Sequence, residues 1–170
     1  PVNVDSGIAG NWVLTPTAQY EECRYAGGTW WEEDPFSSFE IHVDWPGGEG
    51  TDAIESTYVP DIGSRLTGTW DEESGDFQLG TDTTTIRECE YMFYAYDVCG
   101  DAVNCELVSC QNITTIAGAT SESDETKSVE GMTAQADWYY SVTFSYGTSI
   151  PPTQNTGECR GSATVNGERK

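Results

Sequence analysis

The stretch DWYYSVTFSY, residues 137–146, alternates large apolar side chains with polar or aromatic ones. One face would carry Trp138, Tyr140, Val142, Phe144 and Tyr146, and the other would carry Tyr139, Ser141, Thr143 and Ser145. A period of two is typical of a β-strand with one face on a core and the other on water. FEIHVDW (39–45) and SRLTGTW (64–70) repeat the pattern, so antiparallel strands are the expected building units.

Turn-rich segments divide the chain into about eight or nine strands. Residues 44–52, 59–64, 71–77 and 121–128 carry the Gly, Pro, Asp or Ser residues that close turns. The predicted strands are residues 10–22, 37–45, 53–60, 64–71, 76–80, 84–96, 112–120, 129–146 (broken by a bulge) and 158–167.

Short connections predict a meander in which each strand pairs with the next, and closure of such a meander removes its exposed edges. We therefore expect a single domain over residues 1–170. Its fold class is all-β, an antiparallel up-and-down barrel of about eight strands, with a two-sheet β-sandwich as the alternative.

The charge of the chain is strongly negative, with 29 acidic and 7 basic residues among 170 and a net charge of −22. Such a surface repels nucleic acids and anionic lipids, so we expect no nucleic-acid partner. The apolar runs are far shorter than the ~20 residues that span a bilayer, so we also expect no membrane insertion. The acidity would keep the protein soluble, bind divalent cations or attract a cationic protein partner.

The cysteine pattern predicts disulfides. The six cysteines are Cys23, Cys89, Cys99, Cys105, Cys110 and Cys159. Their number is even, they form no CxxC pair, and the chain has a single histidine, so a zinc site is not indicated. Three disulfides would place the protein in an oxidising compartment, extracellular, cell-surface or periplasmic, whereas free buried cysteines would indicate the cytosol.

The strand order also suggests how the cysteines pair. Cys23 ends the first predicted strand and Cys159 begins the last, and these strands are antiparallel neighbours in a closed meander. A Cys23–Cys159 bridge would then fasten the closing seam. We expect Cys89 to pair with one of the three cysteines that follow it, and the remaining two to pair with each other.

A Gly-x-Trp motif, Gly10-Asn11-Trp12, stands at the head of the first predicted strand. With an eight-stranded meander behind it, the chain resembles the lipocalins and the wider calycin group, in a bacterial-type or avidin-like form. The resemblance implies that Trp12 plugs the closed end of the barrel and that an arginine near the last strand, Arg160 or Arg169, packs across it. The second lipocalin motif and the helix before the last strand have no good counterpart. A buried structural Trp12 without family meaning is the alternative.

Aromatic residues are abundant, with six tryptophans and nine tyrosines. Trp30 and Trp31 are adjacent, so in an extended segment one ring faces inward and the other outward. EYMFYAY (90–96) is aromatic on both faces. Aromatic walls near carboxylates suit sugars, flat apolar molecules or cations, although core packing alone could explain the aromatic content. The predicted ligand-binding residues are Trp30, Trp31, Tyr94, Tyr96 and Trp138.

Catalytic motifs such as GxSxG and HExxH are missing from the sequence, so we expect a protein that is not an enzyme. DEESGD (71–76) concentrates acidic residues, and Asp71, Glu73 and Asp76 form a candidate calcium site, with an ordinary hairpin turn as the alternative. No other cofactor is indicated. Asn112-Ile113-Thr114 is the one N-glycosylation sequon in the sequence.

Together these features predict a secreted or cell-surface binding protein. It would hold a small apolar or aromatic molecule, or a glycan, in the aromatic-lined mouth of the barrel. The alternative is a structural subunit that self-assembles into an extracellular layer or filament, with calcium bridging its acidic surfaces.

Overall fold

The computed structural model describes residues 7–33, 37–61, 63–85, 89, 98–101, 104–122 and 128–170. Within these residues the chain forms nine β-strands, and all the pairings between them are antiparallel. The strands are β1 (Gly10–Tyr25), β2 (Trp31–Glu32), β3 (Phe39–Asp44), β4 (Ala53–Val59), β5 (Arg65–Trp70), β6 (Asp76–Thr83), β7 (Glu106–Glu122), β8 (Val129–Tyr146) and β9 (Thr153–Arg169). The prediction of an all-β antiparallel protein is confirmed.

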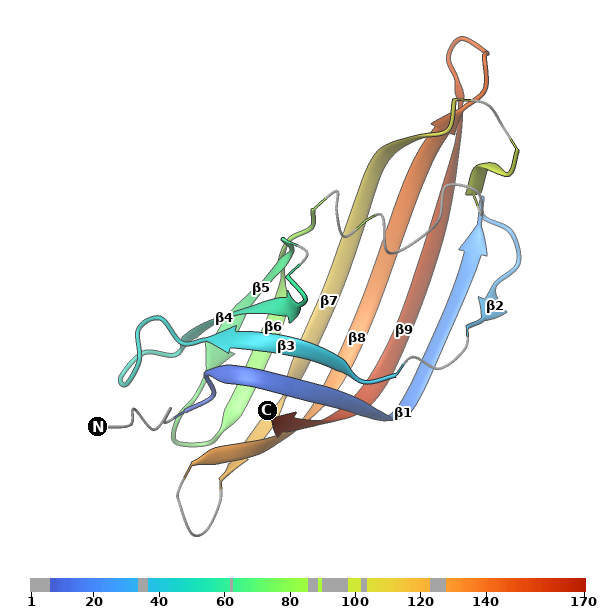
Figure 1. Ribbon diagram of the computed structural model, residues 1–170. Coiled ribbons are helices and arrows are strands. Elements are labelled where there is room, and N and C mark those ends of the chain that lie inside the picture. Colours follow the sequence, from blue (N-terminus) through green and yellow to red (C-terminus); the bar gives the residue numbers. More distant parts are fainter. Residues whose placement is uncertain are drawn as a thin grey trace.

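The strands close into a ring (Figure 1). From β3 to β9 each strand pairs with the next in chain order, and β1 pairs with both β3 and β9. The short β2 pairs with β1 beside this ring. A single sheet that closes on itself is a barrel, so the up-and-down barrel is confirmed and the two-sheet sandwich is wrong.

Unequal strand lengths divide the molecule into two regions. The strands β3 to β6 contain 6 to 8 residues each, whereas β1, β7, β8 and β9 contain 16 to 18. The long strands therefore continue past the ring as an open sheet, which rises to the upper right in Figure 1. We call this open sheet the extension, and the ring itself the closed barrel. The extension consists of β2 with residues 20–25, 106–112, 139–146 and 153–160.

Apolar side chains fill the interior of the closed barrel. This core consists of Ile8, Trp12, Leu14, Ile41, Val43, Ile54, Leu66, Trp70, Phe77, Leu79, Ile116, Val129, Met132, Ala134, Ala136, Ala163 and Val165. Burial of this much apolar surface supplies the main driving force for folding.

Trp12 lies at the end of the closed barrel where β1 begins. Its side chain is fully buried, and its indole N–H donates to the carbonyl of Ile8 at 2.8 Å. The guanidinium of Arg169 lies 5.1 Å from the centre of the Trp12 ring. Of the two arginines considered for this position, Arg169 occupies it. The prediction of Arg160 for this position is wrong, because its guanidinium lies over the ring of Trp30 instead.

Three disulfides link the six cysteines. Cys23 and Cys159 are direct partners across the β1–β9 seam, with Cα atoms 4.1 Å apart. The other bridges are Cys89–Cys110 and Cys99–Cys105. All three agree with the predicted scheme, and they are consistent with an oxidising extracellular compartment. The first bridge lies in a second, smaller core in the extension, together with Val142 and Phe144.

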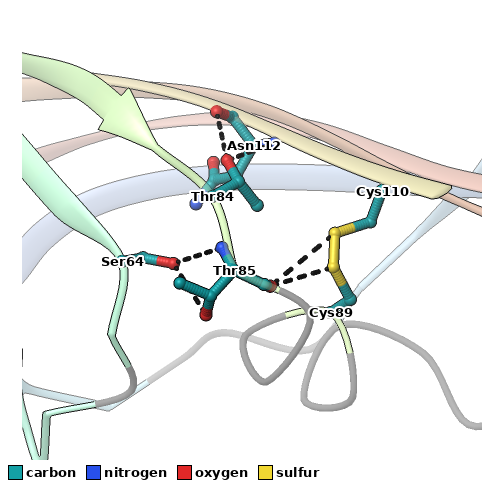
Figure 2. Close-up of a disulfide and its surroundings, with 6 residues drawn as sticks. All are labelled: Ser64, Thr84, Thr85, Cys89, Cys110 and Asn112. Carbon is teal, nitrogen blue, oxygen red and sulfur yellow. Dashed lines mark hydrogen bonds between the residues drawn. A yellow bond between two sulfur atoms is a disulfide. The ribbon is translucent and has the colours of Figure 1, made fainter.

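The connection after β6 is fastened to strands on both of its sides (Figure 2). The Thr84 hydroxyl donates to the carbonyl of Asn112 and accepts its N–H, so it takes the place of a neighbouring backbone at the edge of β7. The buried hydroxyl of Ser64 accepts the N–H of Thr85 at 3.0 Å, and the carbonyl oxygen of Thr85 lies 3.1 Å from Sγ of Cys89.

The strand predicted over residues 84–96 is corrected in part by this arrangement. Thr84 and Thr85 are not in a strand, and most of the remaining residues of this range lie outside the described part of the chain. The long connection begins earlier than predicted because these two residues bond to neighbouring strands through side chains. In addition, β7 begins at Glu106, earlier than the predicted residue 112.

Candidate ligand-binding faces of the extension

The structure distributes the five predicted ligand-binding residues over two faces. Trp31 pairs with Cys23 in the sheet and packs in the core of the extension, so it lies on the inner face. Trp138 packs against the barrel core from that same face. Trp30 contacts Arg24 and Arg160 on the outer face. Tyr94 and Tyr96 lie outside the described residues.

Trp138 reaches across a strand to a carboxylate. It pairs with Gly161 on β9, which in turn pairs with Glu21 on β1. The Trp138 indole lies against Gly161, where a Cβ atom would be only 2.6 Å from the ring carbon Cζ2, and its N–H donates to Glu21. Gly161 therefore makes room for the indole. A glycine in the middle of an alternating strand is the signal in the sequence that could have indicated this close approach.

A second indole–carboxylate pair lies beside the first. The Trp31 N–H donates to Glu33, and the ring centres of Trp31 and Tyr25 are 4.7 Å apart. The backbone N–H of Glu33 donates to the carbonyl of Glu21 at 2.9 Å, which places the two acidic residues next to each other. With Tyr140, which hydrogen-bonds to Glu21, these side chains form what we call the inner cluster: Glu21, Tyr25, Trp31, Glu33, Trp138 and Tyr140.

The electrostatics of the inner cluster are unusual for two of its members. Burial raises the pKa of Glu21 above its ordinary value, against the hydrogen bonds from Trp138 and Tyr140, and the charge of Glu33 raises it further. Burial also raises the pKa of Tyr140, with the charges of Glu21 and Glu33 adding to the effect. Both shifts indicate a half-buried site with surplus negative charge.

The basic side chains of the described residues all bond outside the inner cluster. The pairs are Arg24 with Glu158, Arg65 with Asp82, Arg160 with Glu22, Lys170 with Glu40, and Arg169 with the carbonyl of Gly7. Arg87 and Lys127 lie outside the described part of the chain.

The outer face carries an ordered arrangement around Trp30, which we call the Trp30 belt. The guanidinium groups of Arg24 and Arg160 lie 4.4 Å and 4.3 Å from the centre of the Trp30 ring. Arg24 is paired with Glu158, and Arg160 with Glu22. Because each glutamate also accepts a tyrosine hydroxyl and an arginine N–H, the pKa of both carboxyl groups is lowered.

A surface groove of about 420 Å³ lies next to the Trp30 belt and shares Arg160 with it; we call it the outer groove. Its lining comes from four strands: Tyr20, Ile113, Thr115, Asp137, Trp138, Tyr139, Arg160, Gly161 and Ser162. The sequence analysis did not predict most of these residues. They lie on the solvent-facing side of different strands, and the local sequence does not show which residues of neighbouring strands lie side by side.

The acidic hairpin between β5 and β6 lines another open groove, of about 990 Å³. Asp71 accepts the backbone N–H groups of Glu73 and Ser74, so it closes the turn, and these bonds lower its pKa. Asp76 also lines this groove. Calcium binding by Asp71, Glu73 and Asp76 stays a prediction.

Another group of possible metal ligands is brought close together in the described residues. Its members are Glu21, Cys23 and Cys159, whose ligand atoms lie within 4.8 Å of one another. The two sulfurs are bonded to each other, so they are not available as thiolate ligands.

Two residues of the glycosylation sequon, Asn112 and Thr114, are buried, whereas Ile113 between them is exposed. Asn112 is 9% exposed, and its side-chain oxygen accepts the hydroxyl of Thr114 at 2.7 Å. The side chain of Asn112 is therefore already hydrogen-bonded within the folded sheet.

Comparisons of the chain with protein-family models, with curated proteins and with solved structures found no match. Within the described residues, no helix is long and apolar enough to cross a membrane.

Proposed function

We propose that this protein is an extracellular binding protein, not an enzyme, and that the inner cluster holds a small organic molecule with an apolar surface and a positive charge. The observation that carries the proposal is the pair of neighbouring carboxylates, Glu21 and Glu33, each bonded to an indole on a half-buried aromatic face. Aromatic rings attract organic cations, and a nearby carboxylate adds to that attraction.

The charge balance supports a cationic ligand. The described arginines and lysines all have partners elsewhere, so none of them neutralises Glu21 and Glu33. A cation in the inner cluster would favour the ionised form of Glu21, whose pKa is raised in the free protein. Affinity should therefore fall as the pH is lowered through the pKa of Glu21.

The site is proposed at the junction of the closed barrel and the extension, and not inside the barrel. The barrel interior is occupied by its own apolar core, whereas Trp138 and Tyr140 lie just beyond it on the same inner face. The proposed ligand would lie near the mouth of the barrel. The three disulfides are consistent with the proposed secreted or cell-surface setting.

Calorimetric titration with choline tests the proposal. Its neutral carbon isostere, 3,3-dimethylbutan-1-ol, is the matched ligand control. We expect choline to bind and the isostere to bind at least about tenfold more weakly. The double variant E21Q/E33Q should lose this preference, whereas E168Q, which removes one exposed charge far from the inner cluster, should keep it.

Equal binding of choline and its isostere, or an equal effect of E168Q, would contradict the proposal. The variants R87Q and K127Q test the two basic residues outside the described part of the chain. Choline binding that is seen in R87Q or K127Q but not in the unchanged chain would contradict the proposal. It would show that the inner cluster pairs with that basic side chain of the protein itself.

Assembly is the second candidate function, favoured by one observation. Ile150, in the loop between β8 and β9 at the far end of the extension, is 99% exposed, and Val108 is 48% exposed. Exposed apolar side chains at one end suit a contact between copies of the chain. Light scattering after size-exclusion chromatography tests it: a multimer that dissociates in I150S supports assembly, and a strict monomer excludes it.

A further inference from the structure

The outer groove lies on the opposite face of the sheet from the inner cluster, and Trp138 is the one residue that belongs to both sets. Its side chains form two rows across the strands. Register places Ile113, Tyr139 and Arg160 in one row, and Thr115, Asp137, Ser162 and Tyr20 in the next. A groove of about 420 Å³ falls within the usual range for small-molecule sites.

Apolar surface is exposed in the outer groove. Tyr20 is 47% exposed and Ile113 is 50% exposed, although the chain as a whole has a net charge of −22. Neither residue fills a core, since both point to solvent on the outer face of the sheet. Exposed apolar side chains beside a hollow commonly mark a contact with a ligand.

The two tyrosines of the outer groove are held in place. The hydroxyl of Tyr20 donates to Glu22, and that of Tyr139 donates to Glu158 at 2.7 Å. These glutamates are in turn bonded by Arg160 and Arg24, which enclose the ring of Trp30. The Trp30 belt thus fixes two aromatic rings before any ligand arrives, and such preorganisation lowers the entropic cost of binding.

The polar groups of the outer groove do not favour an anionic ligand. Arg160 already pairs with Glu22, and Asp137 forms no ion pair among the described residues. The carboxylate of Asp137 can accept two hydroxyl groups, and Thr115 and Ser162 lie beside it in the same row. The groove therefore combines aromatic surface, a free acceptor and hydroxyl groups.

We propose that the outer groove binds a pyranose ring of a neutral glycan. The apolar face of the sugar would pack on Tyr139 or Tyr20, and its hydroxyl groups would bond to Asp137 and Ser162. The net charge of −22 and the carboxylate in the groove disfavour acidic sugars. This site is independent of the inner cluster and of the cationic ligand proposed for it.

Titration of the full chain with cellobiose, maltose and N,N′-diacetylchitobiose, followed by nuclear magnetic resonance, tests the proposal. Digalacturonate is the acidic control. At least one neutral disaccharide should bind and shift the amide signals of β8 and β9 around Asp137 and Ser162, whereas digalacturonate should not. D137A should weaken binding by about tenfold or more, because it removes a charged acceptor of sugar hydroxyls.

Two further variants separate the role of the ring from folding. Y139A should abolish binding, whereas Y139F keeps the ring and should retain most of it. Q111A, on the same face of β7 but outside the groove, should bind normally. E21Q/E33Q should leave glycan binding unchanged and D137A should leave choline binding unchanged, so the two proposals can fail separately.

The proposal is overturned if none of the neutral disaccharides binds at millimolar concentration, if digalacturonate binds as well as they do, or if D137A and Q111A have equal effects.

Discussion

The closed barrel and the extension share the four long strands β1, β7, β8 and β9, yet they differ in what lies on each face. In the closed barrel the inner face is a continuous apolar core, whereas the inner face of the extension has a small core built around the Cys23–Cys159 bridge. The extension also has half-buried carboxylates and aromatic rings on its inner side, and the Trp30 belt on its outer side.

This difference separates the region that holds the main apolar core from the region that contributes to both candidate sites. A closed ring satisfies the hydrogen bonds of every strand and can devote its interior to packing. An open sheet that continues from such a ring is supported at its base, so its two faces are free to carry polar and aromatic groups. Both candidate sites lie where the two regions meet.

Each region contains a tryptophan that packs against arginine side chains. Comparing these two tryptophans, Trp12 and Trp30, gives the sharpest test of the difference between the regions. Trp12 is fully buried beside Arg169, whereas Trp30 is only half-buried between Arg24 and Arg160. W12A should lower the free energy of unfolding by about 3–5 kcal/mol, because it leaves a cavity in the barrel core. W30A should lower it by only about 1–2 kcal/mol. Urea denaturation measures both, and similar losses would contradict the division into two regions.

Removing the seam disulfide should have the next largest effect. The Cys23–Cys159 bridge closes a loop with a sequence separation of 136 residues. The variant C23A/C159A should therefore lose about 2–4 kcal/mol of stability. Hydrogen exchange should show the loss of protection concentrated in the extension, since the apolar core of the closed barrel is unchanged. Uniform loss over both regions would show that they unfold as one unit.

The edge of β7 offers a smaller test at the boundary of the two regions. Thr84 exchanges two hydrogen bonds with the backbone of Asn112 (Figure 2). T84V keeps the shape of the side chain and should lower the free energy of unfolding by about 0.5–1.5 kcal/mol. T83V, at the exposed neighbouring position, is the control and should have little effect on the thermal midpoint.

The smallest expected effect concerns Glu21 and depends on pH. Its pKa in the folded protein is raised above the ordinary value of 4.5, so the folded state binds the proton more tightly than the unfolded state does. Stability therefore falls as the pH rises from about that ordinary value through the folded pKa. E21Q removes this loss, and it should raise the thermal midpoint by a few degrees at neutral pH.

The same measurement at low pH is the control for E21Q. Below the ordinary pKa, Glu21 is protonated in both states, and the difference between E21Q and the unchanged chain should be at its smallest. A difference that does not vary with pH would show that the charge of Glu21 is not what limits stability there.

Local alternation in the sequence was sufficient to predict the strands of the ring. Residues 137–146 alternate with a period of two and lie within β8 (Val129–Tyr146), whose range matches the strand predicted over 129–146. The predicted bulge matches the register shift opposite Val129 and Gly131. The positions of Cys23 and Cys159 at the ends of the outermost strands predicted their bridge, because closure makes those strands neighbours. Alternation also indicated that Trp30 and Trp31 face opposite ways, which is how the structure places them.

The candidate sites depended on the tertiary structure. Alternation assigns a side chain to a face but does not say which side chains lie beside it on the neighbouring strands. That Arg169, and not Arg160, packs on Trp12 follows from the β1–β9 register, which joins residues more than a hundred positions apart. The same register brings Trp138 across Gly161 to Glu21, and Arg160 to Glu22.

The sequence by itself therefore determined the all-β class and the order of the strands, because these follow from local periodicity and turn positions. It favoured closure of the sheet and, given closure, predicted the seam disulfide. Only the tertiary structure decided how far β1 and β7–β9 continue past the ring, and which acids, aromatic rings and arginines meet on the extension. The physical reason is that strand overhang and register are set by contacts between distant segments.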